Sequence, residues 1–226
     1  GMEARPTFGP QSYAWGSEAQ VDWYEASAEL GGDRVKLQVF CMRSMASGAA
    51  FHRAYPRATQ QAFLEAHEHA FAYFGGVHRV LRYDNLSSAV RKILRGRRRE
   101  ETVRFIAFRS HWRFEAQFCT PAAGHEKGGV EGEIGRFRRR HLTPIPHVGS
   151  LAALNAALTA ADARDDARRI EARTETVGAA FEREQVVLNP LPGSVFDVSQ
   201  VLSCRVDTKA RICVRQSYYS VPARLA

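Results

Sequence analysis

The order of strand-like and helix-like segments constrains the fold of this chain more than any single motif does. Apolar and β-prone residues predict strands over residues 19–24, 34–42, 50–55, 77–84 and 114–119. Helical spacing of apolar residues predicts helices over residues 59–74, 101–112 and 130–142. Three strands joined by short turns, followed by alternating helices and strands, are typical of a central sheet with helices on its faces. We therefore expect an α/β fold with a mixed five-stranded sheet.

The predicted secondary structure changes twice in the last third of the chain, first to a long helix and then to strands. A further helix is predicted from Leu151 to about Arg173, and it becomes so highly charged after Asp162 that we expect it to leave the core as a connector. Beyond Asn189, alternating segments predict the beginning of a small β domain. We therefore predict four parts: a leader (1–16), a core domain (17–148), a helical connector (149–188) and the start of a truncated β-barrel-like domain (189–226).

The formal net charge of the 226-residue chain is +8, which favours a polyanionic partner, nucleic acid first. The cations gather in two patches: Arg91, Lys92, Arg95, Arg97, Arg98 and Arg99 in the first, and Arg136, Arg138, Arg139 and Arg140 in the second. Local acidic residues do not interrupt the second patch. We therefore favour phosphate contacts over an ordinary solvated surface for both patches.

The sequence also indicates a cytoplasmic location. The four cysteines are scattered without a Cys-x-x-Cys pair, which suits a reducing compartment and argues against a structural zinc site. No apolar run reaches the roughly 18 residues that a membrane span needs. Gly1 before Met2 is typical of a protease-cleavage remnant, so we expect the chain to be part of a longer protein.

Three carboxylates stand at positions that suit a metal site. Asp22 lies inside a strand otherwise fit for burial, where a charge is costly unless it is paired or binds a metal. Asp84 ends a buried strand, and Glu131 opens a helix after Gly128 and Gly129. Mg²⁺ and Mn²⁺ take carboxylate oxygens, and two such ions about 3.5–4 Å apart can clamp the oxygens of an in-line phosphoryl displacement.

Each carboxylate also has a simpler interpretation. Asp22 could form an ion pair with an arginine, Asp84 could belong to a strand-ending turn, and Glu131 could interact with the helix dipole. Glu133 is a less suitable third carboxylate than Glu131, because it lies on roughly the opposite side of the helix. Glu131 also shares its face with Lys127 and Arg138, as expected for a helix lying against a DNA backbone.

Four short stretches resemble one family in the right order. They are Ala19-Gln20-Val21-Asp22-Trp23, Phe74-Gly75-Gly76-Val77, Tyr83-Asp84-Asn85-Leu86 and His125-Glu126-Lys127-Gly128-Gly129-Val130-Glu131. They resemble the DDE transposases and retroviral integrases, and among these the IstA-type insertion-sequence transposases. The resemblance extends from about residue 17 to the end of the chain.

The resemblance implies a ribonuclease-H-like fold with Asp22, Asp84 and Glu131 as catalytic triad and metal ligands. It implies Mg²⁺ or Mn²⁺, with two ions when DNA is bound, and both cleavage of element ends and transfer of the freed 3′ hydroxyl into target DNA. It further implies a homo-oligomer on DNA, an IstB-type partner ATPase and a DNA-reading helix-turn-helix upstream of this chain. DNA contacts are expected from Arg95, Arg97, Arg98, Arg99, Lys127, Arg136, Arg138 and Arg139, and accessory roles from Asn85 and His125.

Two other functions stay open from the residues alone. One is a ribonuclease-H-like nuclease that cuts DNA without joining it. The other is a DNA-binding regulatory module that keeps the basic surface but has lost catalysis. Loss of activity on changing Asp22 or Asp84, with DNA binding kept, would separate an enzyme from such a module.

Overall fold

The computed structural model describes residues 12–83, 103–118, 128–170, 173–199, 204–214, 217–222 and 224. The chain divides into two compact units, residues 1–196 and residues 197–226. The larger unit is an α/β structure and the smaller one contains a β-hairpin. The boundaries predicted after residues 16, 148 and 188 remain a proposal about the domains of the chain.

A mixed sheet with strand order β3-β2-β1-β4-β5 forms the centre of the larger unit. Strands β1 (Glu18–Leu30), β2 (Asp33–Ser44) and β3 (Ala50–Tyr55) form an antiparallel meander, and β4 (Val80–Tyr83) and β5 (Glu115–Phe118) run parallel to β1. Gly31 and Gly32 join β1 to β2 with φ values of 61° and 98°, which glycine adopts without strain. The predicted five-stranded sheet is confirmed, with one addition. The two-residue strand β6 (His147–Val148) pairs with the far end of β1 and is too short to show a period in the sequence.

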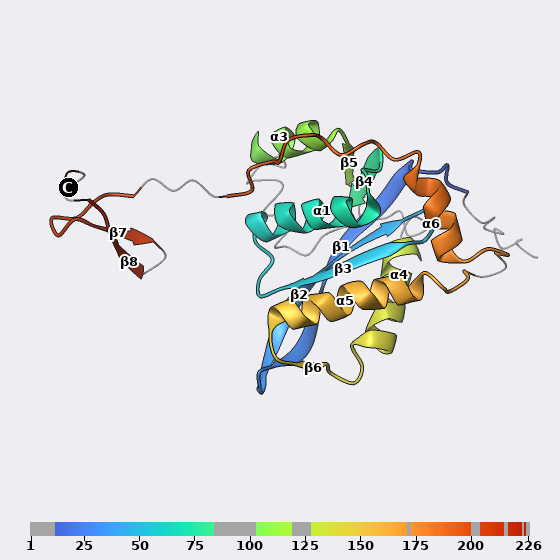
Figure 1. Ribbon diagram of the computed structural model, residues 1–226, viewed down its shortest axis with the longest axis horizontal. Coiled ribbons are helices and arrows are strands. Elements are labelled where there is room, and N and C mark those ends of the chain that lie inside the picture. The colour runs from blue at the N-terminus through green and yellow to red at the C-terminus, as the bar shows by residue number, and fades with distance from the viewer. Residues whose placement is uncertain are drawn as a thin grey trace, which may run out of the picture. The chain divides into compact units, whose positions relative to one another are not determined.

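Helices cover both faces of this sheet (Figure 1). Helix α1 (Gln60–Phe74) begins at Thr59, whose side chain accepts the N–H of Ala62, and ends at Gly75 in the left-handed conformation. Helix α3 (Val103–Trp112) packs beside α1 through buried aromatic side chains. The other face carries α4 (Gly128–His141) and α5 (Leu151–Asp165) over a core that includes Tyr24, Phe137 and Leu158.

Helix α5 lies along β3, the first strand in the sheet order. The amide of Asn155 bonds both backbone groups of Ala54, accepting its N–H at 2.7 Å and donating to its carbonyl at 3.0 Å. Two turns further on, the Asp162 carboxylate accepts the backbone N–H of His52 at 2.8 Å and contacts His52 Nδ1 at 2.7 Å. Both side chains are buried, so polar groups of α5 complete the hydrogen bonding of the strand.

The helix expected to run to about Arg173 ends at Asp165. Its acidic residues do not turn towards solvent, since Asp162 and Asp165 are both buried and pair with groups of β3 and α4. A separate helix, α6 (Val177–Gln185), starts at Thr176, whose side chain accepts the N–H of Ala179. Among the described residues, no helix is long and apolar enough to cross a membrane.

A buried carboxylate attaches α6 to the sheet. Glu184 accepts the backbone N–H of Gly16 at 3.0 Å and the hydroxyl of Ser44 at 2.6 Å, and His78 Nε2 lies 3.5 Å from it. Burial alone would raise the pKa of Glu184. The hydrogen bond and charge of His78, together with the hydroxyl of Ser44, outweigh burial and lower this pKa to about 2. Glu184 is therefore ionised in the folded protein down to strongly acidic pH.

Glu184 should make the larger unit acid-sensitive. Its pKa falls from an ordinary 4.5 to about 2 on folding, so its stabilisation is complete above about pH 4.5 and is lost as the pH falls towards 2. We expect Glu184→Gln to be about 3 kcal/mol less stable than the unchanged protein at pH 7. This difference in the free energy of unfolding should be roughly 2 kcal/mol smaller at pH 3 than at pH 7. Urea unfolding of both proteins at the two pH values measures the difference, and a difference independent of pH would contradict the lowered pKa of Glu184.

The smaller unit contains the antiparallel hairpin of β7 (Arg211–Val214) and β8 (Ser217–Ser220). A turn at residues 207–209 is held by Asp207, which accepts the backbone N–H groups of Lys209 and Arg211. The guanidinium of Arg211 lies 4.9 Å from the ring centre of Tyr218. Val206 pairs with Ile212 through an isolated bridge.

Candidate active site

Asp22 lies on β1, the strand at the middle of the sheet order. Its side chain is half-buried, and its Oδ1 accepts the backbone N–H of Trp23 at 2.7 Å. Side chains alternate along a strand, so Asp22 shares a face with Gln20 and Tyr24. Tyr24 belongs to the core beneath α4 and α5, which places Asp22 on the same side of the sheet as α4.

The first turn of α4 is fastened to β1 next to Asp22. The backbone N–H of Val130 donates to Gln20 Oε1 at 3.1 Å. A Cβ on Gly129 would lie 2.8 Å from this same oxygen and 2.7 Å from Met45 Cε. A side chain at position 129 would require the ends of Met45 and Gln20 to shift, so glycine at this position allows the close approach. Glu131 follows in this first turn, and its side chain is exposed.

Strand β4 brings the chain to the level of Asp22. Tyr83 is the last described residue of β4, and it pairs with Val21, the residue before Asp22. Asp84, the next residue in the sequence, lies outside the described residues. So do the other predicted site residues between β4 and α4: Asn85, Arg95, Arg97, Arg98, Arg99, His125 and Lys127.

The structure therefore brings two of the three predicted carboxylates onto elements that touch each other, β1 and the start of α4. Within the described part of the chain, no three His, Cys, Asp or Glu side chains are grouped closely enough to hold a metal ion. That part contains Asp22 and Glu131 but not Asp84. Both offer carboxylate oxygens, one half-buried and one exposed, which are the donors that hard divalent cations prefer.

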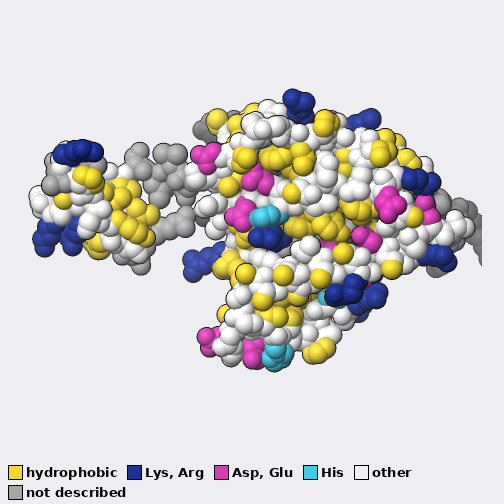
Figure 2. All heavy atoms as spheres, viewed as in Figure 1, with side chains coloured by type: hydrophobic (Ala, Val, Ile, Leu, Met, Phe, Trp, Pro, Cys, Tyr) yellow, Lys and Arg dark blue, Asp and Glu magenta, His cyan; other side chains and the backbone are white. Residues whose placement is uncertain are grey.

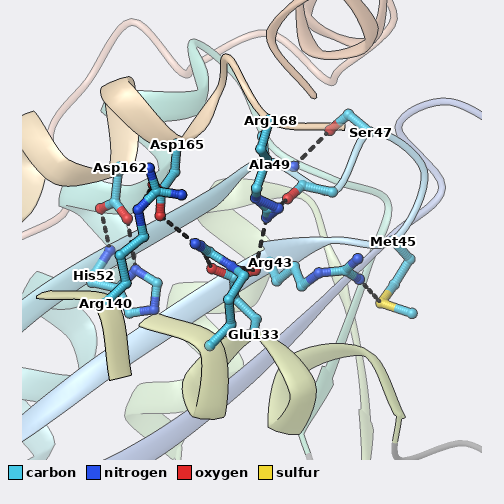
Figure 3. Close-up of polar contacts among 12 residues, drawn as sticks. Arg43, Met45, Ser47, Ala49, His52, Glu133, Arg140, Asp162, Asp165 and Arg168 are labelled. Atoms are coloured by element: carbon cyan, nitrogen blue, oxygen red, sulfur yellow. Dashed lines mark hydrogen bonds and ion pairs between the residues drawn. The ribbon is translucent and has the colours of Figure 1, made fainter. Parts of the chain in front are cut away.

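Glu133 has a different environment from Glu131. It is 4% exposed, and its carboxylate contacts the guanidinium groups of Arg136 and Arg168. Arg168 donates to Glu133 Oε2 at 2.7 Å (Figure 3). Because both cations engage this carboxylate inside the protein, Glu133 serves the packing of α4.

The arginine side chains of the second basic patch point in different directions, some into the protein and some into solvent. Arg136 faces inward and donates to Asp165 Oδ2 at 2.6 Å as well as to Glu133. Arg138 and Arg139 are exposed, and the Arg138 guanidinium lies 5.8 Å from the ring centre of Tyr24. Arg138 and Arg139 thus remain open to solvent, whereas Arg136 joins α4 to α5. On the face of the larger unit drawn in Figure 2, the described basic side chains lie among acidic and apolar ones.

Sequence reasoning missed Gln20, Met45 and Arg168 as residues that hold α4 in place. Gln20 offers a signal, because it precedes Asp22 by two residues and so must lie on the same face of β1. Arg168 offers none, since its partner is 35 residues away in the sequence, from 133 to 168.

No family model matches the chain, but it is similar to named proteins over nearly its whole length. It is 37% identical to a transposase of Aminobacter aminovorans over 98% of the chain, and 38% identical to the transposase for insertion sequences IS1326/IS1353 of Pseudomonas aeruginosa over 97%. It is 29% identical to the transposase for insertion sequence element IS21 of P. aeruginosa over 92%. The chain spans 44%, 43% and 53% of the length of these relatives.

Solved structures share the fold at low sequence identity. The HTLV-2 integrase catalytic core domain in complex with magnesium covers 76% of this chain and 99% of its own length, with a TM-score of 0.54 and 14% identity. The simian T-cell lymphotropic virus intasome in complex with PP2A regulatory subunit B56 gamma covers 96% of this chain and 78% of its own matched chain, with a TM-score of 0.55 and 13% identity. The sheet order and flanking helices are thus those of the ribonuclease-H-like integrase catalytic cores. In sequence, the chain is similar over nearly its whole length to part of these insertion-sequence transposases.

Proposed function

We propose that this chain is the catalytic core of a DNA transposase, which cleaves the ends of its element and joins them to target DNA. The observation that carries the proposal is the attachment of the first turn of α4 to β1 through Gln20, two residues from Asp22. This attachment holds the helix that carries Glu131 against the strand that carries Asp22. The relatives named transposases and the integrase-core fold support the same activity.

We propose Asp22, Asp84 and Glu131 as the catalytic carboxylates. The pairing of Tyr83 with Val21 supports the inclusion of Asp84, because the residues that follow each are Asp84 and Asp22. Glu131 is preferred to Glu133, whose carboxylate is already neutralised by two arginines. Asn85 and His125 keep proposed accessory roles.

These carboxylates would hold Mg²⁺ or Mn²⁺, two ions when DNA is bound, and a neighbour in fold is described in complex with magnesium. The ions would neutralise the charge that develops on the phosphate and activate the attacking oxygen. The protein would keep Asp22 and Glu131 at fixed positions before DNA arrives, so that little reorganisation is needed during the reaction.

Two displacements at phosphorus would follow. In the first, a water oxygen bonds to phosphorus at the element end and the bond to the 3′ oxygen breaks, leaving a 3′ hydroxyl. In the second, this hydroxyl oxygen bonds to a target phosphorus while the bond from that phosphorus to the target's own 3′ oxygen breaks, which leaves a 3′ hydroxyl on the target strand. Neither step forms a covalent bond between protein and DNA. A homo-oligomer on paired ends and an IstB-type ATPase are the proposed partners, and an intasome among the neighbours in fold is in keeping with such an assembly.

Strand transfer by the full-length protein tests the proposal. The substrate is a labelled element end that is already cut to expose its 3′ hydroxyl, with plasmid target and Mg²⁺ or Mn²⁺. We expect labelled end joined to the plasmid. Cut DNA without joined product would favour a nuclease, and DNA binding without either product would favour a regulatory module.

The DNA interface on α4 can be tested by salt dependence. Removing one phosphate contact lowers the slope of log affinity against log salt by about 0.9. We expect this change for Arg138→Gln, because the Arg138 side chain is exposed. Arg164→Gln on α5, also exposed, is the control and should leave the slope unchanged. Fluorescence anisotropy over a salt series measures both, and equal slopes for all proteins would exclude Arg138 as a phosphate contact.

A further inference from the structure

Glu131 and Glu133 project from α4 in nearly opposite directions. Each helical residue advances the direction by about 100°, so two positions differ by roughly 200°. In keeping with this, Glu131 is exposed and Glu133 is buried. Any contact that fixes the Glu133 side chain therefore also fixes the rotation of α4 about its axis, and with it the direction of Glu131.

Two arginines bind Glu133, and they are attached to different elements: Arg136 also pairs with Asp165 of α5, whereas Arg168 reaches the sheet. Arg136 lies on α4 itself, so its pair with Glu133 turns with the helix. Arg168 lies in the segment after α5, and its Nη2 donates to Glu133 Oε2 at 2.7 Å (Figure 3). Among the described hydrogen bonds of Glu133, this is the one that reaches it from outside α4.

Arg168 is in turn attached to the turn between β2 and β3. The same Nη2 donates to the carbonyl of Gly48 at 2.9 Å. This turn is part of the sheet framework, because the backbone N–H of Met45 donates to the Glu18 carbonyl of β1 at 3.0 Å. One guanidinium thus links Glu133 to the framework that carries Asp22.

We propose that Arg168 is a positioning residue for Glu131. The inference rests on the proposed function, in which Glu131 is a catalytic carboxylate. Gln20 and Gly129 set the distance between the start of α4 and β1. The Arg168–Glu133 pair ties the rotation of α4 to the sheet, as the Arg136–Asp165 pair ties it to α5. Arg168 touches neither DNA nor metal in this role and acts through the orientation of α4.

The kinetic test uses Arg168→Gln in the full-length protein. A misplacement of about 1 Å costs on the order of 10²-fold in rate, so we expect single-turnover strand transfer to slow by about this factor. The DNA dissociation constant should stay within about two-fold, since no phosphate contact is removed. The Mn²⁺ concentration for half-maximal rate should rise, because a rotated α4 would hold the Glu131 carboxylate in a poorer position to bind the ion. Loss of folded protein alone would lower the amplitude without changing this concentration.

Two variants make the test specific. Arg169→Gln changes the next residue, which is an exposed arginine, and should leave rate and Mn²⁺ dependence unchanged. Arg168→Lys keeps the positive charge but can satisfy fewer acceptors, and we expect it to recover about ten-fold of the lost rate.

Hydrogen–deuterium exchange tests the same link without activity. In Arg168→Gln, amides of residues 128–133 should exchange faster, whereas those of α1 should not change. Unchanged exchange in residues 128–133 overturns the inference, and so does an unchanged rate in a protein whose parent is active. If the parent joins no DNA, the proposed function fails, while exchange still decides whether Arg168 holds α4.

Discussion

Asp22→Asn should lower both DNA cleavage and strand transfer by the full-length protein by about 10³-fold or more. The substitution keeps the shape of the side chain but removes the charge that a divalent cation needs. Metal ions contribute several kcal/mol of charge stabilisation to such transition states, and each 1.36 kcal/mol corresponds to about ten-fold in rate. Asp22 lies on a central strand beside the start of α4, so the sheet holds its backbone in place. The strand-transfer assay measures the loss.

Two further variants serve as comparisons for Asp22→Asn. Glu25→Gln changes an exposed carboxylate on the same strand, which pairs with the exposed Lys36, and should leave both reactions unchanged. Glu131→Gln should match the loss caused by Asp22→Asn, with element-end binding kept in both variants. An Asp22→Asn protein that joins DNA at more than about a tenth of the parent rate would refute the metal-binding role, since that loss equals only about 1.4 kcal/mol.

Asp162→Ala should cause the largest loss of stability, about 3–5 kcal/mol. The substitution removes the acceptor of the His52 backbone N–H and the partner of its ring nitrogen, and both groups are buried. A buried donor without an acceptor is costly, and the smaller side chain also leaves a space beside His52, whose ring stacks on that of Phe137 with 3.7 Å between the ring centres. Chemical unfolding at neutral pH measures the change in the free energy of unfolding.

The matched control for Asp162 is Arg164→Ala on the same helix. Arg164 is exposed, so its loss should change stability by no more than about 0.5 kcal/mol. If Asp162→Ala proves equally mild, the pairing of α5 with β3 is not a major source of stability.

The fold is largely predictable from the sequence because its signals are local. The alternation of Val35, Leu37, Val39 and Cys41 identifies β2, and the glycines after Phe74 mark the end of α1. The secondary structure around Asp22 and Glu131 is predictable for the same reason, since it depends on a β-prone segment and on a helix start. Their roles as metal ligands remain proposals.

Pairings between distant elements are not predictable in this way. The sequence around Arg136 contains no hint that Asp165 neutralises it, and the charges after Asp162 resemble those of a solvated helix. A charged side chain is stable inside a protein when its partner is present, but the partner comes from another element and depends on packing. Local charge patterns therefore overstate how much of the basic surface is open to DNA.

The side chains of α5 that bond the backbone of β3 also affect whether copies of the protein can aggregate through this strand. A protein that gathers several copies on DNA raises its own local concentration, and an exposed strand would then be a template for sheet-to-sheet aggregation. Asn155 and Asp162 already occupy the backbone groups of Ala54 and His52 that a strand from another copy would need. In the proposed assembly on DNA, this cover would keep neighbouring copies from pairing through β3.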